Sequence, residues 1–416
     1  MYNVTVIGAG GHVGLPFAII NALNGNQVIG IDTNHEIVKK LNFGEYPYVE
    51  EEGKESLEKS IKSGNLKFTT NKDIDVNSDI VAVMIGTPVD SENNPRLDDV
   101  LSIFDNTISP FIKKRTANKL PSPIIILRST VSPGTTDLIH ARLKRSNRFD
   151  NYILAFCPER VIQGKSIKET ALLPQLIGAH TELEFLKIAR YFDSFNKADK
   201  IFLTPKEAEI AKLFTNMYRY ITFAIANEFY IIGDKEGVDA HKVIKAANFG
   251  YPRMDVPMPG PNVGGPCLFK DGRFLLNKIP FVDLIQSSFI INEGMPEYIF
   301  WKMMEVNPDI KSVKIYGMTF KADNDDTRHS LSYKFKKICE RNGLEVGWTD
   351  PYVGDSPNAL EHFDAHVIMT PHSVYKDMWE FGPQFYGFPK DTVLVDVWKI
   401  ANEQTKKSLN GIVRVE

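Results

Sequence analysis

The sequence predicts an α/β protein built from two Rossmann-like, doubly wound domains joined by a central helical domain. Short runs rich in Val and Ile alternate with helical patterns from residue 3 to about 200, and the alternation resumes at residue 312. Between these regions lie a long helical pattern and a stretch rich in Gly and Pro. Strands that are almost continuously apolar are typical of a parallel sheet with helices on both faces.

The first region reads as strands and helices in strict alternation. The expected strands are 3–7, 27–31, 79–85, 123–128, 152–156 and 200–203. The expected helices are 13–24, 34–42, 97–113, 134–145 and 181–194.

A change of pattern at Thr204-Pro205 marks the start of the central region. Thr204 is a good N-cap, Pro205 suits the first helical position, and Glu207 completes a capping box. The helical pattern continues to about Gly237, and a helix of this length usually spans a domain junction or a dimer interface.

The rest of the chain returns to alternation after an irregular stretch. Residues 250–272 are too rich in Gly and Pro for regular structure. Further helices are expected at 239–248 and 281–305, and strands at 312–316, 344–348, 365–369 and 392–396.

Composition excludes several classes of protein. The net charge is −3 and the pI about 6.3, which gives no general electrostatic case for binding nucleic acid or an anionic membrane. We expect no secretory signal and no membrane span. The three cysteines, Cys157, Cys267 and Cys339, are odd in number and widely spaced. They favour a reducing cytoplasm over a disulfide framework or a zinc cluster, and leave one cysteine available as a nucleophile.

The first expected strand runs into a Gly-rich turn at residues 8–14. Such a turn before a helix lets the backbone approach a pyrophosphate, although this one is a residue longer than the standard G-x-G-x-x-G spacing. Asp32 ends the second strand, where a carboxylate accepts from ribose hydroxyls and repels a 2′-phosphate, so NAD is favoured over NADP. The residues expected at this cofactor are Gly8, Gly10, Gly11, His12, Val13, Gly14 and Asp32.

Three more motifs follow expected strands. Thr87 lies in Gly-Thr-Pro after strand 79–85, and Thr130 lies in Arg-Ser-Thr-Val-Ser-Pro-Gly-Thr after strand 123–128. Glu159 and Arg160 follow strand 152–156. Doubly wound folds bind ligands at the carboxyl ends of their strands. Ordinary turns and a surface ion pair are the alternatives.

Lys212, Asn216 and Arg219 lie on one face of the long expected helix, at spacing i, i+4, i+7. This face could carry catalytic groups or could be a solvated polar stripe.

The segment Gly-Gly-Pro-Cys-Leu-Phe-Lys-Asp at 264–271 contains Cys267. A cysteine in a Gly-rich loop can approach a substrate without crowding, and the neighbouring charge of Lys270 raises its thiolate fraction. The alternative is a buried structural cysteine. A dense run of charge at 317–330 suits either phosphate recognition or a salt-bridged turn.

Taken in this order, the motifs resemble those of the UDP-glucose/UDP-N-acetylmannosamine 6-dehydrogenase family, from residue 3 to about 400. The resemblance implies an NAD-binding domain at 1–203, a helical dimerisation and catalytic domain at 204–305, and a UDP-sugar-binding domain at 306–416. It also implies a cytoplasmic homodimer.

The same resemblance implies a four-electron oxidation of a sugar C6 hydroxymethyl through a covalent intermediate on Cys267. Lys212 and Asn216 would stabilise oxyanions, Asp271 would assist with water and protons, and Glu159 would work in thioester hydrolysis. Thr130 would serve both catalysis and the cofactor, with Thr87, Lys270 and Arg328 at the cofactor. The implied substrate-binding residues are Arg160, Val161, Lys212, Asn216, Arg219, Tyr251, Arg253, Gly264, Phe320 and Lys321.

The branch of the family is indicated by arginines. Pro-Glu-Arg-Val at 158–161, with Arg219 and Arg253, resembles enzymes of UDP-N-acetylmannosamine and UDP-N-acetylglucosamine, with Arg253 reaching across a dimer. Gln163 stands where the UDP-glucose branch has a second Glu. We therefore expect a UDP-N-acetylhexosamine, the manno epimer foremost.

Three departures from the family pattern are the lengthened glycine turn, Trp398 in place of an arginine, and Tyr251 in place of a histidine. The alternatives to this reading are a UDP-glucose 6-dehydrogenase, a non-catalytic NAD- and UDP-sugar-binding scaffold, and a simpler two-electron dehydrogenase.

Overall fold

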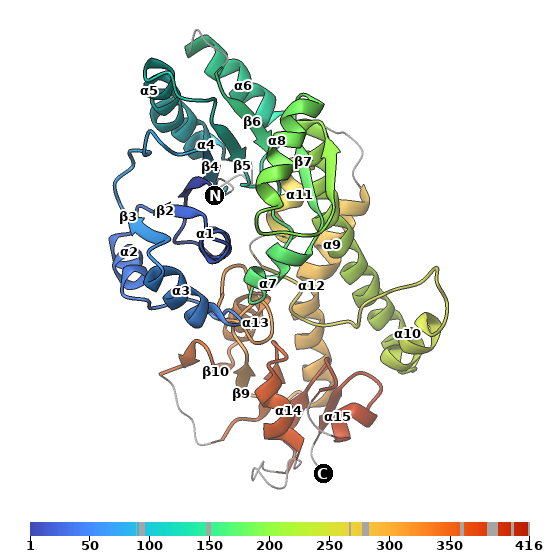
Figure 1. The fold of residues 1–416 in the computed structure, drawn as a ribbon. Coiled ribbons are helices and arrows are strands. Elements are labelled where there is room, and N and C mark those ends of the chain that lie inside the picture. Colours follow the sequence, from blue (N-terminus) through green and yellow to red (C-terminus); the bar gives the residue numbers. More distant parts are fainter. Residues whose placement is uncertain are drawn as a thin grey trace. The chain divides into compact units, whose positions relative to one another are not determined.

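The computed structural model divides into two compact units (Figure 1). Unit 1 comprises Met1–Thr215 with Arg273–Lys278, and unit 2 comprises Asn216–Gly272 with Ile279–Glu416. The residues described are 1–88, 90, 96–146, 151–265, 268–276, 283–357, 362–380, 390–400 and 403–414. Cys267, the expected nucleophile, lies outside these residues.

Unit 1 contains an eight-stranded sheet of order β3-β2-β1-β4-β5-β6-β7-β8. Neighbouring strands pair in parallel, except that β6 and β7 are antiparallel. The strand order reverses beside β1, and doubly wound sheets bind ligands at such a switch point. The strands are β1 Asn3–Ile7, β2 Gln27–Ile31, β3 Leu66–Thr69, β4 Ile80–Val83, β5 Ile124–Leu127, β6 Ile153–Phe156, β7 Gln175–Gly178 and β8 Lys200–Leu203.

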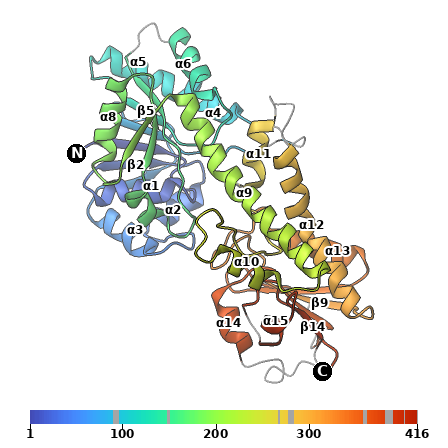
Figure 2. The same cartoon turned by 90° about the vertical axis from the view of Figure 1, so that its right-hand side faces the viewer.

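Helices cover both faces of this sheet because both faces are apolar. One core cluster packs α1, α3, α7 and α8 against the sheet, and another packs η1, α5 and α6 against the opposite face. Figure 2 shows strands of this sheet with α1 and α3 on one side and α5 and α6 on the other. The helices are α1 Gly14–Leu23, α2 His35–Asn42, α3 Gly53–Lys62, α4 Asp98–Ile103, the π-helix η1 Phe104–Ile108, α5 Ser109–Ala117, α6 Thr135–Ser146, α7 Ser166–Leu172 and α8 Glu182–Phe192.

The long central helix begins as the sequence predicts. Helix α9 is Pro205–Lys235, 31 residues long. The backbone N–H of Thr204 donates to Glu207 Oε2 at 2.8 Å, and the N–H of Glu207 donates to Thr204 Oγ1 at 3.4 Å. The predicted capping box is therefore confirmed.

Three further helices follow α9 before the second sheet begins. They are α10 Ala240–Asn248, α11 Leu268–Leu276 and α12 Asp283–Val306. The expectation of irregular structure through residue 272 was wrong for 268–272, which are helical. After Pro266 the segment contains a single glycine, Gly272, and the Leu-Phe-Lys-Asp at 268–271 can form a helix.

Unit 2 contains a six-stranded sheet of order β11-β10-β9-β12-β13-β14. Its four central strands are parallel and its two edge strands antiparallel. Helices α12 and α13 pack on one face, and α14 contributes Tyr375 to a smaller cluster on the other. The elements are β9 Ser312–Tyr316, α13 Leu331–Arg341, β10 Glu345–Asp350, β11 Gly354–Asp355, β12 Ala365–Ile368, α14 Ser373–Glu380, β13 Val393–Val395, α15 Glu403–Lys407 and β14 Ile412–Arg414.

The predicted fold class is confirmed, with two parallel-rich sheets and a helical central region. Among the described helices, none has the combination of length and apolar character needed to cross a bilayer.

Candidate active site

The Gly-rich turn of unit 1 closes on itself at its first and last glycines. Gly8 has φ 85° and donates its N–H to Ile31 O at 2.8 Å. A side chain at Gly8 would meet Met84 O at 2.6 Å, and one at Gly14 would collide with Gly8 O. The loop therefore makes the close strand-to-helix approach of a dinucleotide turn, and its extra residue is accommodated between these two glycines.

Asp32 is joined to this turn by a direct hydrogen bond. Its Oδ2 accepts from Gly10 N at 2.8 Å, and its Oδ1 accepts from Asn34 N at 3.0 Å. The side chain is half-buried at the carboxyl end of β2. Each carboxylate oxygen can accept a second hydrogen bond, so ribose hydroxyls can still be accepted here.

A pocket of about 630 Å³ opens at the switch point beside β1. This volume is in the range of small-molecule sites. It is lined by the glycine turn, by the ends of β2 and β4, and by one face of α4 and η1. A glycine cradle at the N-terminus of α1 with a carboxylate beside it fits a dinucleotide. The lining residues are Ile7, Gly8, Gly11, Ile31, Asp32, Thr33, Lys72, Met84, Ile85, Gly86, Asp99, Ser102, Ile103, Asn106 and Thr107.

The face on α4 and η1 was missed by the sequence reading. Asp99, Ser102 and Asn106 are polar, and the five lining residues of this face follow helical spacing, which could have revealed them. By contrast, His12 and Val13 do not line the pocket. The ring of His12 stacks on that of Tyr48, with centroids 3.7 Å apart.

Thr87 and Thr130, both expected at the cofactor, are brought together. Thr87 is buried, and its Oγ1 donates to Thr130 O at 2.7 Å. This bond joins the loops that follow β4 and β5.

Glu159 is held by three donors. It forms an ion pair with the buried Arg128 and accepts from Arg160 N at 2.9 Å and from Val161 N at 3.3 Å. Arg128 in turn stacks over Phe17, with its guanidinium 4.6 Å from the ring centroid. Glu159 thus fixes the loop after β6, and its proposed hydrolytic role remains a prediction.

The three expected residues on α9 differ in exposure. Lys212 is half-buried, Asn216 is buried and Arg219 is exposed. Within the described residues, the Lys212 ammonium forms no hydrogen bond or ion pair. The face is therefore not a uniformly solvated stripe.

Within unit 2, Asn216 and Asp271 form a buried pair. Asn216 Nδ2 donates to Asp271 Oδ2 at 2.5 Å, and Asp271 is 0% exposed. Asp271 lies on α11, which begins at Leu268, the residue after Cys267. A side chain at Gly272 would meet Phe289 at 2.7 Å, so α11 packs closely against its neighbours.

The two described cysteines do not fit a nucleophile. Cys157 and Cys339 are both free and buried. Burial raises the pKa of each thiol to about 12. A thiol of this kind stays protonated at neutral pH and is inert.

The loop that leads to Cys267 is anchored to residues 319–331 of unit 2. Gly265 N donates to His329 O at 3.1 Å, and Leu331 N donates to the side chain of the buried Asn262 at 2.8 Å. Gly265 has φ 99°, and a side chain there would meet the ring of Phe320 at 2.6 Å. Gly264 and Phe320, both expected at the substrate, therefore belong to one docked pair of loops.

The remaining expected residues of unit 2 have specific partners. Arg328 Nη2 donates to Asp326 Oδ2 at 2.6 Å, which is the salt-bridged turn considered from the sequence. Arg253 Nε donates to Tyr251 Oη at 2.9 Å, and both residues are exposed. Lys321 and Lys270 are half-buried.

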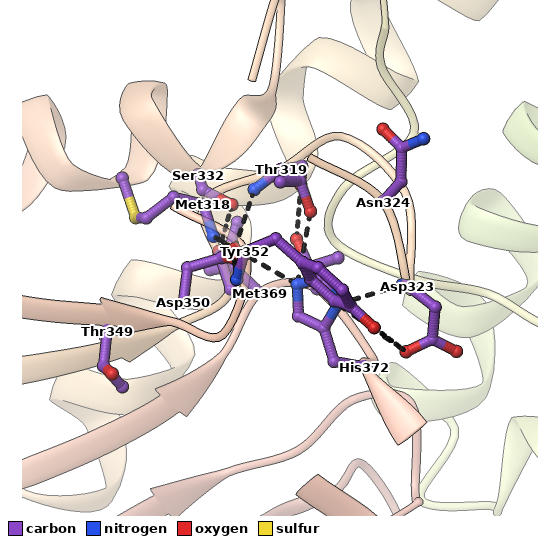
Figure 3. A network of polar contacts seen from close by, with 12 residues as sticks. Met318, Thr319, Asp323, Asn324, Ser332, Thr349, Asp350, Tyr352, Met369 and His372 are labelled. Carbon is purple, nitrogen blue, oxygen red and sulfur yellow. Dashed lines mark hydrogen bonds and ion pairs between the residues drawn. The ribbon is translucent and has the colours of Figure 1, made fainter. Parts of the chain in front are cut away.

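A buried polar network not anticipated from the sequence lies at the carboxyl ends of β9, β10 and β12 (Figure 3). His372 Nε2 lies 3.1 Å from Asp350 Oδ2, and Asp323 N donates to His372 Nδ1 at 2.9 Å. Met318 N donates to Asp350 Oδ2 at 2.6 Å. Burial raises the pKa of Asp350, but the hydrogen bonds from His372 and from backbone N–H groups bring it below its ordinary value. The network fixes the backbone on both sides of Phe320 and Lys321.

Three family models match the chain in sequence. They describe the NAD binding domain (residues 2–196), the central domain (206–292) and the UDP binding domain (314–403) of the UDP-glucose/GDP-mannose dehydrogenase family. This chain belongs to that family.

Individual members of the family are similar over most of their length. UDP-N-acetyl-D-mannosamine dehydrogenase of Methanocaldococcus jannaschii is 32% identical over 386 residues, covering 90% of this chain and 87% of the relative. The structure of the Pyrococcus horikoshii UDP-D-ManNAc dehydrogenase has a TM-score of 0.80 and 30% identity, covering 90% of both chains. That of UDP-N-acetyl-mannosamine dehydrogenase from Staphylococcus aureus has a TM-score of 0.77 and 28% identity, also covering 90% of both chains.

The chain is therefore an NAD-dependent UDP-sugar dehydrogenase, an oxidoreductase acting on a CH–OH group. This confirms the expected family, NAD as cofactor and a UDP-sugar as substrate, and it sets aside the non-catalytic scaffold. The residue-level roles, and the division at 203/204 and 305/306, remain predictions.

Trp398 departs from the family's arginine in a way that the structure explains. Its indole Nε1 donates to Met369 O at 3.2 Å, and its ring packs so closely on Gly260 that no side chain would fit there. In this UDP-sugar dehydrogenase, Trp398 therefore secures the loop that leads to Cys267.

Proposed function

We propose that this dehydrogenase oxidises the C6 hydroxymethyl of a UDP-N-acetylhexosamine, with UDP-N-acetylmannosamine preferred, to the uronate. The catalytic part of this proposal is supported by the buried Asn216–Asp271 pair, because Asp271 lies four residues after Cys267, the proposed nucleophile. The sugar is proposed from relatives that share about 30% identity and carry that substrate in their names.

In the covalent route, Cys267 acts first as the nucleophile and later as the leaving group. NAD, when bound, supplies hydride acceptance in both oxidations. After the first, the Cys267 thiolate forms a C–S bond to the aldehyde carbon, giving a thiohemiacetal oxyanion. Loss of the second hydride leaves a thioester, and water then breaks the C–S bond to give the carboxylate and free thiolate. The balance is one water consumed and two NAD reduced for each sugar.

Lys212 and Asn216 are proposed to stabilise the oxyanions of these tetrahedral species. Lys212 is half-buried, and its ammonium forms no hydrogen bond or ion pair within the described part of the chain, so its charge is available to a ligand. One preorganised donor of this kind contributes about 3 kcal/mol, or two to three orders of magnitude in rate. Asp271, held by Asn216, is proposed to position water and accept a proton.

The thiolate of Cys267 has a proposed local cause. Lys270 lies three residues after Cys267, and helix α11 begins at Leu268, directly after the cysteine. Neighbouring positive charge and a helix N-terminus both lower the pKa of a thiol. Cys157 and Cys339 have the opposite environment, because burial raises the pKa of both thiols.

The sugar preference is proposed to depend on Arg160, Arg219 and Arg253. Arg160 is half-buried, its guanidinium donates to Pro174 O, and burial lowers its pKa. Arg219 and Arg253 are exposed, which leaves both guanidinium groups accessible to a ligand or to a second subunit.

A substrate panel tests this assignment. We expect a higher kcat/KM with UDP-N-acetylmannosamine or UDP-N-acetylglucosamine than with UDP-glucose, and two NADH released for each sugar. A clear preference for UDP-glucose would favour the other branch of the family, and one NADH for each sugar would favour a two-electron dehydrogenase.

We also propose a cytoplasmic homodimer formed by the central helices. Tyr218 (67% exposed), Phe229 (39%) and Ile232 (51%) on α9, and Val243 (53%) on α10, are large apolar residues open to solvent. Helices of this kind usually bury such residues against a partner. A second copy of the chain would cover them and could bring its Arg253 to the site. Mass measurement by light scattering should give a dimer that Phe229→Glu with Ile232→Glu converts to monomer.

A further inference from the structure

Glu209, on the second turn of α9, is a buried carboxylate to which the proposed chemistry assigns no role. It is 1% exposed. Its Oε2 accepts from Gly134 N at 2.5 Å, and its Oε1 accepts from Thr136 N at 2.7 Å and from Thr136 Oγ1 at 2.6 Å. Burial raises the pKa of Glu209, and the hydrogen bonds from Thr136 and Gly134 oppose that rise.

These donors form the N-terminus of α6, which begins at Thr135. The first N–H groups of a helix have no partner within it, and an anion there is stabilised by the helix dipole. A side chain from another helix supplies that anion here. The bonds therefore join α9 to α6, and each is a charge-assisted bond in a site closed to water.

The elements joined in this way carry two of the residues proposed for the reaction. The loop between β5 and α6 contains Thr130, whose carbonyl accepts from Thr87 Oγ1. On α9, Lys212 follows Glu209 by three residues, so the two side chains leave neighbouring positions on the helix surface. Glu209, Lys212, Thr130 and Thr136 all belong to unit 1.

We propose that Glu209 is a positioning residue: it fixes Lys212 relative to the loop of Thr130, so that the ammonium is placed at the reacting carbon. The inference rests on the proposed oxyanion role of Lys212. Glu209 itself touches neither substrate nor cofactor. Displacing a catalytic group by about 1 Å can cost on the order of a hundredfold in rate.

Glu209→Gln is the first test. An amide has one acceptor oxygen, so it cannot serve all three donors, and its NH2 group faces a backbone N–H. Glu207→Gln is the matched control, because Glu207 lies on the adjacent first turn of α9, is exposed, and among the described residues forms hydrogen bonds with Thr204 alone. We expect Glu209→Gln to lower kcat at least tenfold with the KM for NAD within twofold. We expect Glu207→Gln to leave both within twofold.

A double-mutant cycle with Lys212→Ala separates positioning from general support of the fold. If Glu209 acts through Lys212, Glu209→Gln should cost at least tenfold in the wild-type background but less than twofold in the Lys212→Ala background. Single-turnover NADH formation is measured for all four proteins. Thr136→Val, which removes only the hydroxyl donor, is carried through the same cycle and decides the question if Glu209→Gln does not fold.

Two results would contradict the positioning role of Glu209 without contradicting the role of Lys212. One is an equal fold loss of rate from Glu209→Gln in the wild-type and Lys212→Ala backgrounds, and the other is a raised KM for NAD with kcat unchanged. A Lys212→Ala variant with normal kcat would instead contradict the proposed role of Lys212, and the role of Glu209 with it. The two failures are therefore distinguishable.

Discussion

Asn216 on α9 donates its side-chain amide to the fully buried carboxylate of Asp271 on α11, with an N···O distance of 2.5 Å. The two residues lie 55 positions apart in sequence. Burying a carboxylate costs free energy unless it is hydrogen-bonded, and the Asn216 amide supplies one such hydrogen bond to Asp271.

Asn216→Leu should impair both stability and catalysis. The substitution leaves the Asp271 carboxylate with one donor fewer in a buried place, which costs about 1–3 kcal/mol of unfolding free energy. We expect kcat to fall at least tenfold. Asn21→Leu is the control, because the buried Asn21 accepts a hydrogen bond from Tyr191 Oη at 2.9 Å near the C-terminus of α1, away from the proposed catalytic residues. It should lower stability in urea by a similar amount with a much smaller change in kcat, and equal losses of kcat would contradict the catalytic role.

Tyr48→Phe should weaken NAD binding selectively. The Tyr48 hydroxyl donates to Gly10 O at 2.6 Å, and its ring stacks on His12, whose Nδ1 lies 2.8 Å from Gln163 Nε2. Losing one such hydrogen bond is worth about 1 kcal/mol, so the KM for NAD should rise roughly fivefold with kcat unchanged.

The control for this change is Tyr191→Phe. Its hydroxyl donates to Asn21 at 2.9 Å in the core of the same unit. It should lower the Tm and leave the KM for NAD unaltered. An unchanged KM in Tyr48→Phe would show that the glycine turn does not need this support.

Cofactor choice should follow Asp32. The carboxylate lies against Gly10 N in the pocket, where a 2′-phosphate would approach it. We expect kcat/KM with NAD to exceed that with NADP at least tenfold, equivalent to about 1.4 kcal/mol. Asp32→Asn should reduce this ratio. Equal kcat/KM for the two cofactors in the unaltered enzyme would contradict the assignment.

Acid should destabilise the protein in part through His241. Burial, with Lys399 nearby, lowers the pKa of His241 from 6.5 to about 4. The unfolded chain therefore takes up this proton first as the pH falls, and stability is lost between about pH 6.5 and 4. His241 should account for about 2 kcal/mol of the loss from pH 7 to 5.

Urea unfolding of His241→Leu at these two pH values measures that share. The variant should lose about 2 kcal/mol less than the parent between pH 7 and 5. His180→Gln, a change at an exposed histidine, should lose as much as the parent. Parallel losses in all three proteins would show that His241 does not titrate as described.

Sequence patterns predicted the elements with strong periodicity and good caps. The capping box of Thr204 and Glu207 located the start of α9 because both partners are close in sequence. β3 and β7 were missed because each has four residues and includes a polar one, Lys67 in β3 and Gln175 in β7, whereas β4, β5 and β6 have the same length but are wholly apolar. Runs this short carry little periodic signal.

The contacts around the candidate site depend on long-range packing and were less predictable. Nothing local links Asp350 to His372 or Glu209 to Thr136, which lie 22 and 73 residues apart. A carboxylate on a helix is usually solvated, so Glu209 could be recognised only once the fold had buried it. Asp32, by contrast, was identified because its strand-end position is fixed by the β-α-β pattern.

The central claim is that Cys267 carries the covalent intermediate, and Cys267→Ser tests it most directly. Serine is a poorer nucleophile than the thiolate, and an alkoxide leaves far less readily from an ester than a thiolate does from a thioester. The variant, mixed with NAD and substrate, should therefore accumulate covalent enzyme detectable by intact mass. Cys267→Ala should lose net turnover, whereas changes at the buried Cys157 and Cys339 should act through packing alone. A Cys267→Ala enzyme that still released two NADH for each sugar at near-normal rate would contradict the covalent mechanism.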